Sequence, residues 1–187
     1  MKNFIISLFF LLPILVNAQT NVFELTKQQV DSLNLAAKQT DNDTLKMELY
    51  NNLAIFYLEK NRDSSIYYAE KQLAIAKKLK QPIWQGTALT TISYGWLNLG
   101  NYSQSFEAVN EALKLAQDEA SENHYYVPKL NLNATLSQDP NKSRLALLSQ
   151  AYQKLAFLYR SANGNDNKAI SYFLQAAGIA KSIDNFF

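Results

Sequence analysis

Three blocks of the chain repeat one pattern, and this repetition is the strongest constraint on its fold. Each block begins with an apolar residue, then a small residue, then an aromatic residue three positions after the small one. The three stretches are residues 53–57, 92–96 and 155–159. Residues with this spacing lie along one side of a helix. The first half of every block is therefore predicted to be a helix.

A second stretch of small and apolar residues follows each first half. These second halves are residues 65–73, 105–113 and 169–177. The segments that separate the two halves are rich in Asn, Gly and Asp, which favour turns. They are residues 60–63, 100–102 and 163–166. Every block is predicted to be a helix, a tight turn and a second helix.

These blocks resemble the tetratricopeptide repeat (TPR) family, in which small residues let paired helices approach and aromatic residues fill the gaps between pairs. The closest match is residues 100–102 followed by 112–113. The resemblance covers about residues 45–117 and 145–182. It implies an all-α, right-handed solenoid of antiparallel helix pairs.

The repeats are not evenly spaced. Ala54 and Ser93 are 39 positions apart, more than the roughly 34 residues of a standard repeat, whereas Ser93 and Ala156 are 63 apart. About 24 extra residues therefore lie between the second and third blocks, at about 118–143. Two interpretations stay open: a surface excursion or extension of the preceding helix, or a functional insertion, because long loops in compact repeats often bind ligands.

The N-terminus has the pattern of a secretory signal peptide. Lys2 is followed by a mostly apolar run at residues 4–16. Residues 16–18 are small enough to occupy the positions before a signal peptidase cleavage site. We predict that residues 1–18 are removed before Gln19 and that the protein is exported to a bacterial periplasm. A retained anchor is the alternative, although the run is shorter than the ~20 residues that span a bilayer. No later segment is apolar enough to insert into a membrane.

The remaining chain divides into two parts. Residues 19–42 are predicted to be a capping helix, with Thr26 as its N-cap, and a linker. Residues 43–187 are predicted to form the solenoid of three helix pairs. At residues 183–187 the chain ends on two phenylalanines, which either fold back as a plug, meet a neighbouring molecule, or lead into a longer protein.

Composition argues against several classes of function. Formal net charge is +2, and Lys2 is the only charged residue of the first 18, so +1 remains after cleavage. This balance gives no electrostatic reason to expect nucleic acid or an anionic membrane surface as the ligand. The chain has no cysteine, one histidine (His124) without a metal partner nearby, and isolated glycines. We therefore expect no enzymatic activity, no cofactor and no metal.

The resemblance also implies a binding surface, because the first helix of each TPR pair lines the concave face, where a protein or peptide binds. The residues expected there are Asn51, Ile55, Thr90, Tyr94, Asn98, Gln153, Phe157 and Arg160. Ile55, Tyr94 and Phe157 stand where carboxylate-clamping members carry polar groups, so a hydrophobic segment fits better than a clamped carboxylate. The alternative is that these three side chains pack between neighbouring pairs.

Two functional hypotheses follow. A signal peptide before long-helix repeats resembles the extracytoplasmic sensor regions of bacterial histidine kinases and helix-turn-helix regulators, which implies the sensor part of a signal-transduction protein. The alternative is a free-standing periplasmic scaffold or assembly protein. Self-association through the C-terminal end is compatible with the first hypothesis.

Overall fold

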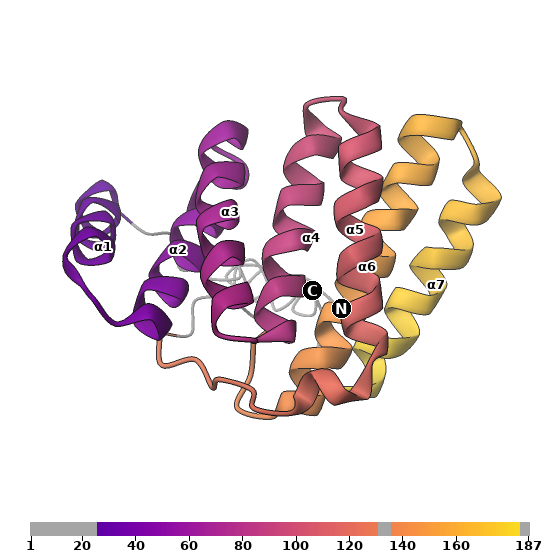
Figure 1. Ribbon diagram of the computed structural model, residues 1–187. Helices are drawn as coiled ribbons and strands as arrows, with labels where there is room; N and C mark the ends of the chain where they lie inside the picture. The colour runs from indigo at the N-terminus through magenta and orange to yellow at the C-terminus, as the bar shows by residue number, and fades with distance from the viewer. Residues whose placement is uncertain (1–25, 131–135, 184–187) are drawn as a thin grey trace, which may run out of the picture.

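The computed structural model describes residues 26–130 and 136–183, and all regular structure in these two ranges is helical. The helices stand side by side in chain order, from α1 at one end to α7 at the other (Figure 1). Their bounds are α1 Lys27–Gln39, α2 Asp43–Tyr57, α3 Arg62–Lys78, α4 Pro82–Asn98, α5 Tyr102–Gln117, α6 Pro140–Asn163 and α7 Asp166–Ser182. The predicted all-α solenoid is confirmed.

Short turns join the helices into three pairs, α2 with α3, α4 with α5 and α6 with α7. Gly100 and Gly164 have φ angles of 76° and 57°, a left-handed conformation that glycine adopts without the clash of a Cβ atom. Asn61 ends the first turn, where its side chain accepts a hydrogen bond of 2.9 Å from the backbone N–H of Ser64. Because the turns are this short, the two helices of a pair run antiparallel.

The N-terminal helix starts where the sequence predicts a cap. Thr26 and Gln29 form a capping box that satisfies backbone N–H groups at the start of α1. Asn42 caps α2 through its side chain, which accepts from the backbone N–H of Leu45. Val30 and Ala37 of α1 are buried, and α1 packs against α2.

Small residues allow the two helices of a pair to approach closely. The hydroxyl of Ser65 donates a 2.8 Å hydrogen bond to the carbonyl of Ala54, and that of Ser105 donates one of 2.7 Å to the carbonyl of Ser93. Small residues act between successive pairs as well, because a Cβ atom on Gly95 of α4 would lie 2.5 Å from a side chain of α3. A larger residue at any of these positions would push neighbouring helices apart.

The first and third pairs contain the same stack of tyrosines. The two stacks are Tyr50, Tyr57 and Tyr68, and Tyr152, Tyr159 and Tyr172. The ring centroids of the last two members lie 5.7 Å apart in the first stack and 5.5 Å apart in the second. The recurrence shows that the sequence repeat is also a repeat of side-chain packing.

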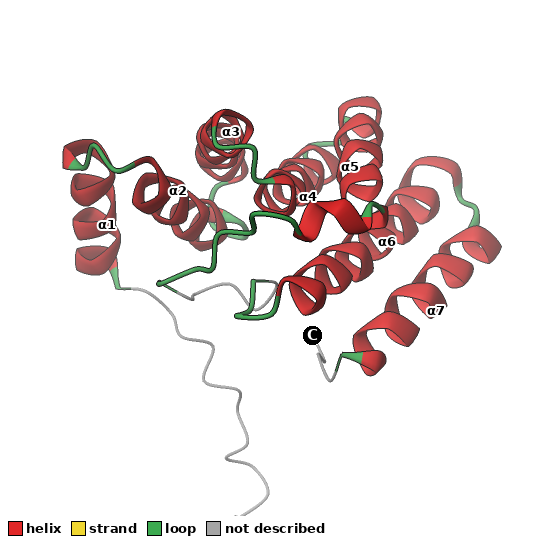
Figure 2. Ribbon diagram, turned by 60° about the horizontal axis from the view of Figure 1, so that its bottom comes forward, coloured by secondary structure: helices red, strands yellow, loops and turns green. Residues whose placement is uncertain are grey.

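The connection between α5 and α6 crosses the solenoid. α5 ends at Gln117 and the 3₁₀-helix η1 follows at Glu119–Glu122, so the connection does not extend α5. Residues 123–130 then run along α4 and α2, on the side away from α3 and α5 (Figure 2). Because α6 begins at Pro140, the extra residues are 118–139, slightly fewer than the repeat spacing predicts.

Candidate functional site

The eight residues predicted to face a partner all lie on α2, α4 and α6. We call the side of these helices that residues 123–130 cross the inner face. Asn51 and Thr90 are each 3% exposed, and the Thr90 hydroxyl donates to the carbonyl of Thr87 at 2.8 Å. Neither side chain can contact a partner in this structure, so these two residues do not form part of an accessible site.

Part of the inner face is already occupied by the chain itself. The side chain of Gln81 accepts from the N–H of Tyr126 at 2.7 Å and donates to the carbonyl of His124 at 2.8 Å. The indole N–H of Trp84 donates to the Tyr126 carbonyl at 2.8 Å. Residues 123–130, which we call the crossing segment, are thus held through their backbone.

A buried carboxylate holds the far end of the crossing segment. Glu48 is 1% exposed, and its two oxygens accept from the backbone N–H groups of Lys129 at 2.6 Å and Leu130 at 3.0 Å. Burial, followed by the hydrogen bond to Glu48, raises the pKa of the Tyr126 hydroxyl. A buried charge needs such partners. We call Glu48, Asn52, Gln81 and Trp84 the covered half of the inner face.

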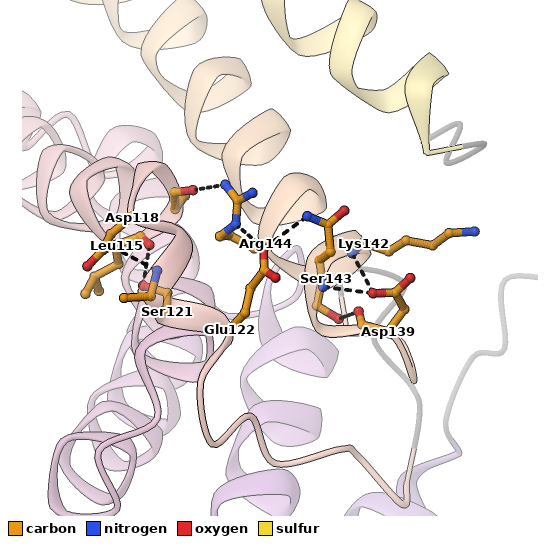
Figure 3. Close-up of polar contacts among 11 residues, drawn as sticks. Leu115, Asp118, Ser121, Glu122, Asp139, Lys142, Ser143 and Arg144 are labelled. Carbon is orange, nitrogen blue, oxygen red and sulfur yellow. Dashed lines mark hydrogen bonds and ion pairs between the residues drawn. The ribbon is translucent and has the colours of Figure 1, made fainter.

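The two ends of the connection are tied to each other (Figure 3). Arg144 of α6 is 6% exposed. It donates to Glu122 of η1 at 2.6 Å and to the carbonyl of Ala116 at 3.0 Å. The hydrogen bond from Arg144 lowers the pKa of Glu122. Asp139 caps α6 by accepting from the N–H of Asn141 at 2.9 Å, so the connection is an integral part of the fold.

The rest of the inner face is centred on Tyr94. Lys154 of α6 places its ammonium 4.4 Å from the centre of the Tyr94 ring, and Arg62 of α3 places its guanidinium carbon 5.4 Å from it. Glu59 accepts from Arg62 at 2.6 Å. Hydrogen bonds from Arg62 and Tyr94 lower the pKa of Glu59, whereas burial raises the pKa of Tyr94.

Both cations beside Tyr94 lack full compensation. Burial lowers the pKa of Lys154 to about 8, and the charge of Glu59 offsets this only in part. None of the described carboxylates forms an ion pair with its ammonium, which donates to Gln153 Oε1 at 3.5 Å. One nitrogen of Arg62, Nη1, is buried and finds no hydrogen-bond partner among the described residues. Desolvated donors of this kind favour binding of an anionic group.

Sequence reasoning missed Lys154 because a lysine in an amphipathic helix is ordinarily solvated. One signal could have found it. Lys154 precedes Phe157 by three positions, so helical periodicity places the two on the same side of α6.

The other predicted residues lie around this cluster. Asn98 donates to the carbonyl of Tyr94 at 2.7 Å. Arg160 lies over the ring of Phe157, with its guanidinium carbon 5.7 Å from the ring centre, and that ring packs edge-on against Phe173. Ile55 is half-buried on α2. We call Ile55, Glu59, Tyr94, Asn98, Lys154 and Phe157 the open half of the inner face.

Gln153 lies at the edge of the open half, where its Oε1 accepts from Lys154 at 3.5 Å. It lines a cavity of about 500 Å³ between α6 and α7, together with Phe173 and Ala177. The structure thus separates the predicted site residues into two places.

Two further findings concern metal binding and membrane-spanning helices. Within residues 26–130 and 136–183, no three acidic, histidine or cysteine side chains lie close enough together to hold a metal ion. Among the same residues, no helix combines the length and apolarity needed to cross a bilayer.

Comparison with protein families identifies a relationship. A family model described as the SusR N-terminal TPR domain matches residues 18–173. Searches of curated proteins and of solved structures find no match. The matched range contains the connection and all eight predicted residues.

Proposed function

We propose that this chain, which belongs to the family described as the SusR N-terminal TPR domain, binds a protein or peptide on the open half of its inner face. A TPR domain is a protein-interaction module, and such modules act without catalysis. The covered half holds the crossing segment through backbone hydrogen bonds, so of the two halves it is the open one that the described residues leave accessible to a ligand.

One observation carries this proposal: Lys154, which none of the described carboxylates pairs, flanks the exposed part of the Tyr94 ring together with Arg62, whose Nη1 is unpaired although its charge is paired with Glu59. Lys154 and Arg62 both lie against Tyr94, and Phe157 adds apolar surface on the neighbouring helix. An apolar segment with one carboxylate would pack on the rings and place its charge beside Lys154. This ligand differs from the purely hydrophobic segment that the sequence favours, because the burial of Lys154 emerges only from the structure.

The experiment is a selection from a library of random peptides, followed by titration of the selected peptides. Tyr94→Ala and Lys154→Met should each weaken binding by about tenfold or more, which corresponds to about 1.4 kcal/mol. Leu35→Ala, an exposed position on α1, is the matched control and should bind as the wild type does. Peptides that bind equally well to the wild type and to all three variants would refute the proposed site.

The pH dependence of binding is a second readout. Because the pKa of Lys154 is about 8, raising the pH from about 7 to about 9 removes most of its charge. An acidic peptide should bind more weakly at the higher pH, and its amide-substituted counterpart should not. The Lys154→Met protein should show no difference between the two pH values for either peptide.

We further propose that residues 1–18 export the chain to the periplasm. The family match begins at residue 18, which agrees with a mature protein starting at Gln19. Expression in a Gram-negative host should yield a periplasmic protein with Gln19 at its N-terminus. A cytoplasmic protein that keeps Met1 would contradict export, and a membrane-bound one would indicate an anchor.

We favour a role as the sensor part of a signal-transduction protein over a free-standing scaffold. The support is the family description, which names an N-terminal domain. An antibody raised against the chain should detect, in the source bacterium, a polypeptide larger than 21.2 kDa. A band at or below that mass would favour the scaffold.

A further inference from the structure

The outermost helix, α7, carries apolar side chains that nothing in the described structure covers. Ile170 is 55% exposed and Leu174 is 69% exposed. They are four positions apart, and Gly178 follows at the same spacing, so all three share one side of the helix. The Leu174 side chain is the most exposed large apolar group of the described residues. Two large apolar side chains that are neighbours on one exposed helix face form an apolar stripe, a small candidate interaction surface.

Gly178 has no explanation within the described part of the chain. A Cβ atom on Gly86 would lie 2.3 Å from a side-chain carbon of Leu147, and one on Gly95 would meet a neighbour at 2.5 Å, whereas one on Gly178 would meet nothing within 4 Å. A glycine inside an exposed helix costs about 1 kcal/mol relative to alanine. A close approach from outside the described residues would give the glycine a purpose.

The internal repeat shows what this face of α7 does elsewhere in the molecule. Phe106 of α5 stands at the repeat position of Ile170, and its ring packs edge-on against Tyr159 of α6 at 5.4 Å. Val109, at the position of Phe173, is fully buried against α6. On α7, Phe173 borders the 500 Å³ cavity instead. The stripe repeats this packing only at Ile170, because Asn110 and Lys114 of α5, at the positions of Leu174 and Gly178, are exposed. An apolar side chain at position 174 is therefore particular to α7.

We propose that the occupant is α7 of a second copy of this chain, packed antiparallel about Leu174. In that arrangement Ile170 of one copy lies opposite Gly178 of the other, so a large side chain meets a position without one. Asp166 of one copy lies near Lys181 of the other, and the two-fold symmetry makes this charge pair twice. Both charged side chains are exposed. The stripe is thus complementary to itself in shape and in charge.

Antiparallel packing also places Ile170 of one copy beside Ala177 and Lys181 of the other, two residues that line the cavity. A contact made by one helix from each copy is small, so the dimer should be weak and dependent on concentration. The proposed ligand surface around Tyr94 is not part of this contact. A failure of the dimer would therefore leave the proposed function unaffected, and the reverse also holds.

Because the chain has no cysteine, a single introduced thiol reports the geometry directly. At the two-fold axis, the Leu174→Cys side chains of two copies come close enough for a disulfide, which needs Cβ atoms about 3.5–4.5 Å apart. Mild oxidation of this variant should yield a covalent dimer on a non-reducing gel. Leu35→Cys, also solvent-accessible but on α1, is the matched control and should remain monomeric.

Light scattering of the wild-type chain over a concentration series should show a monomer–dimer equilibrium. Leu174→Glu should shift it at least about tenfold toward monomer, or about 1.4 kcal/mol, and its helical circular dichroism should match that of the wild type because the side chain is exposed. A wild-type monomer at all concentrations overturns the proposal.

If the wild type is a monomer, the thiol of the Leu174→Cys variant shows whether the chain itself covers the stripe. If it reacts slowly with a thiol reagent in the monomer, another part of the chain covers the stripe; if it reacts fast, the stripe is exposed in the monomer. In a wild type that is monomeric at all concentrations, either result rules out the second copy as the partner of α7. Equal cross-linking of Leu35→Cys also overturns the proposal, because the disulfide would then report random collisions.

Discussion

The two halves of the inner face use similar helices for opposite purposes. In the covered half, Glu48, Gln81 and Trp84 direct their polar atoms at backbone groups of the crossing segment. In the open half, Lys154 lies against Tyr94 without a carboxylate partner among the described residues, and Arg62 of α3 flanks the same ring with one nitrogen unpaired. The covered half resembles a peptide complex in which the peptide belongs to the chain. The difference teaches that a TPR inner face contributes to stability where it is filled and can contribute to recognition where it is not.

Trp84→Ala should have the largest effect on the free energy of unfolding. Its size would show whether the covered half is part of the core. Trp84 is 1% exposed, packs with Met47 and Leu136, and donates to the carbonyl of Tyr126. Truncating a buried aromatic residue costs about 3–5 kcal/mol. Urea unfolding should give a loss in that range. A loss below about 1 kcal/mol would mean that the crossing segment detaches at little cost.

Glu48→Gln should have the next largest effect. The substitution removes the charge that two backbone N–H groups share, and charge-assisted hydrogen bonds contribute about 1.5–3 kcal/mol. Hydrogen exchange at Lys129 and Leu130 should accelerate along with the loss of stability. Glu59→Gln, in the open half, is the control, since its carboxylate is exposed, and it should change stability by less than about 0.5 kcal/mol. Equal losses in the two variants would remove the distinction between the halves.

Lys154→Met should have the smallest effect on the free energy of unfolding, and unlike the other two substitutions it should increase stability. Below pH 8 the lysine is protonated in both the folded and the unfolded state, and the folded state bears the cost of burying the charge. Between about pH 8 and 10.5 the unfolded state holds the proton and the folded state does not, so the free energy of unfolding of the wild type should rise with pH. The variant should lack this rise and be more stable at neutral pH by about 1 kcal/mol, since partial exposure reduces the cost. A destabilised variant would mean that Lys154 serves the fold.

Much of the fold could be predicted from the sequence because its signals are local. Turn residues such as Gly100 and Asn61, the cap at Thr26 and the spacing of small residues each specify a short stretch of backbone. The path of the crossing segment could not be predicted in this way. It depends on pairs such as Glu48 and Lys129, which are 81 positions apart, and periodicity carries no information about such pairs.

The site was predicted less well for the same reason. The TPR resemblance placed Tyr94 and Phe157 on the concave face, yet it also placed Asn51 and Thr90 there, and the structure encloses both. Which half of the face is filled depends on the crossing segment. The role of Lys154 depends on its distance from Tyr94 on a different helix, which a single sequence does not report.

The central claim is that the open half binds the partner while the crossing segment stays in place. The most direct test is NMR chemical-shift mapping during titration with a selected peptide. Shifts should concentrate at Tyr94, Lys154 and Phe157, and the amides of Lys129 and Leu130 should not move. Large shifts at those two amides with none at Tyr94 would mean that the peptide displaces the crossing segment, and would contradict the account.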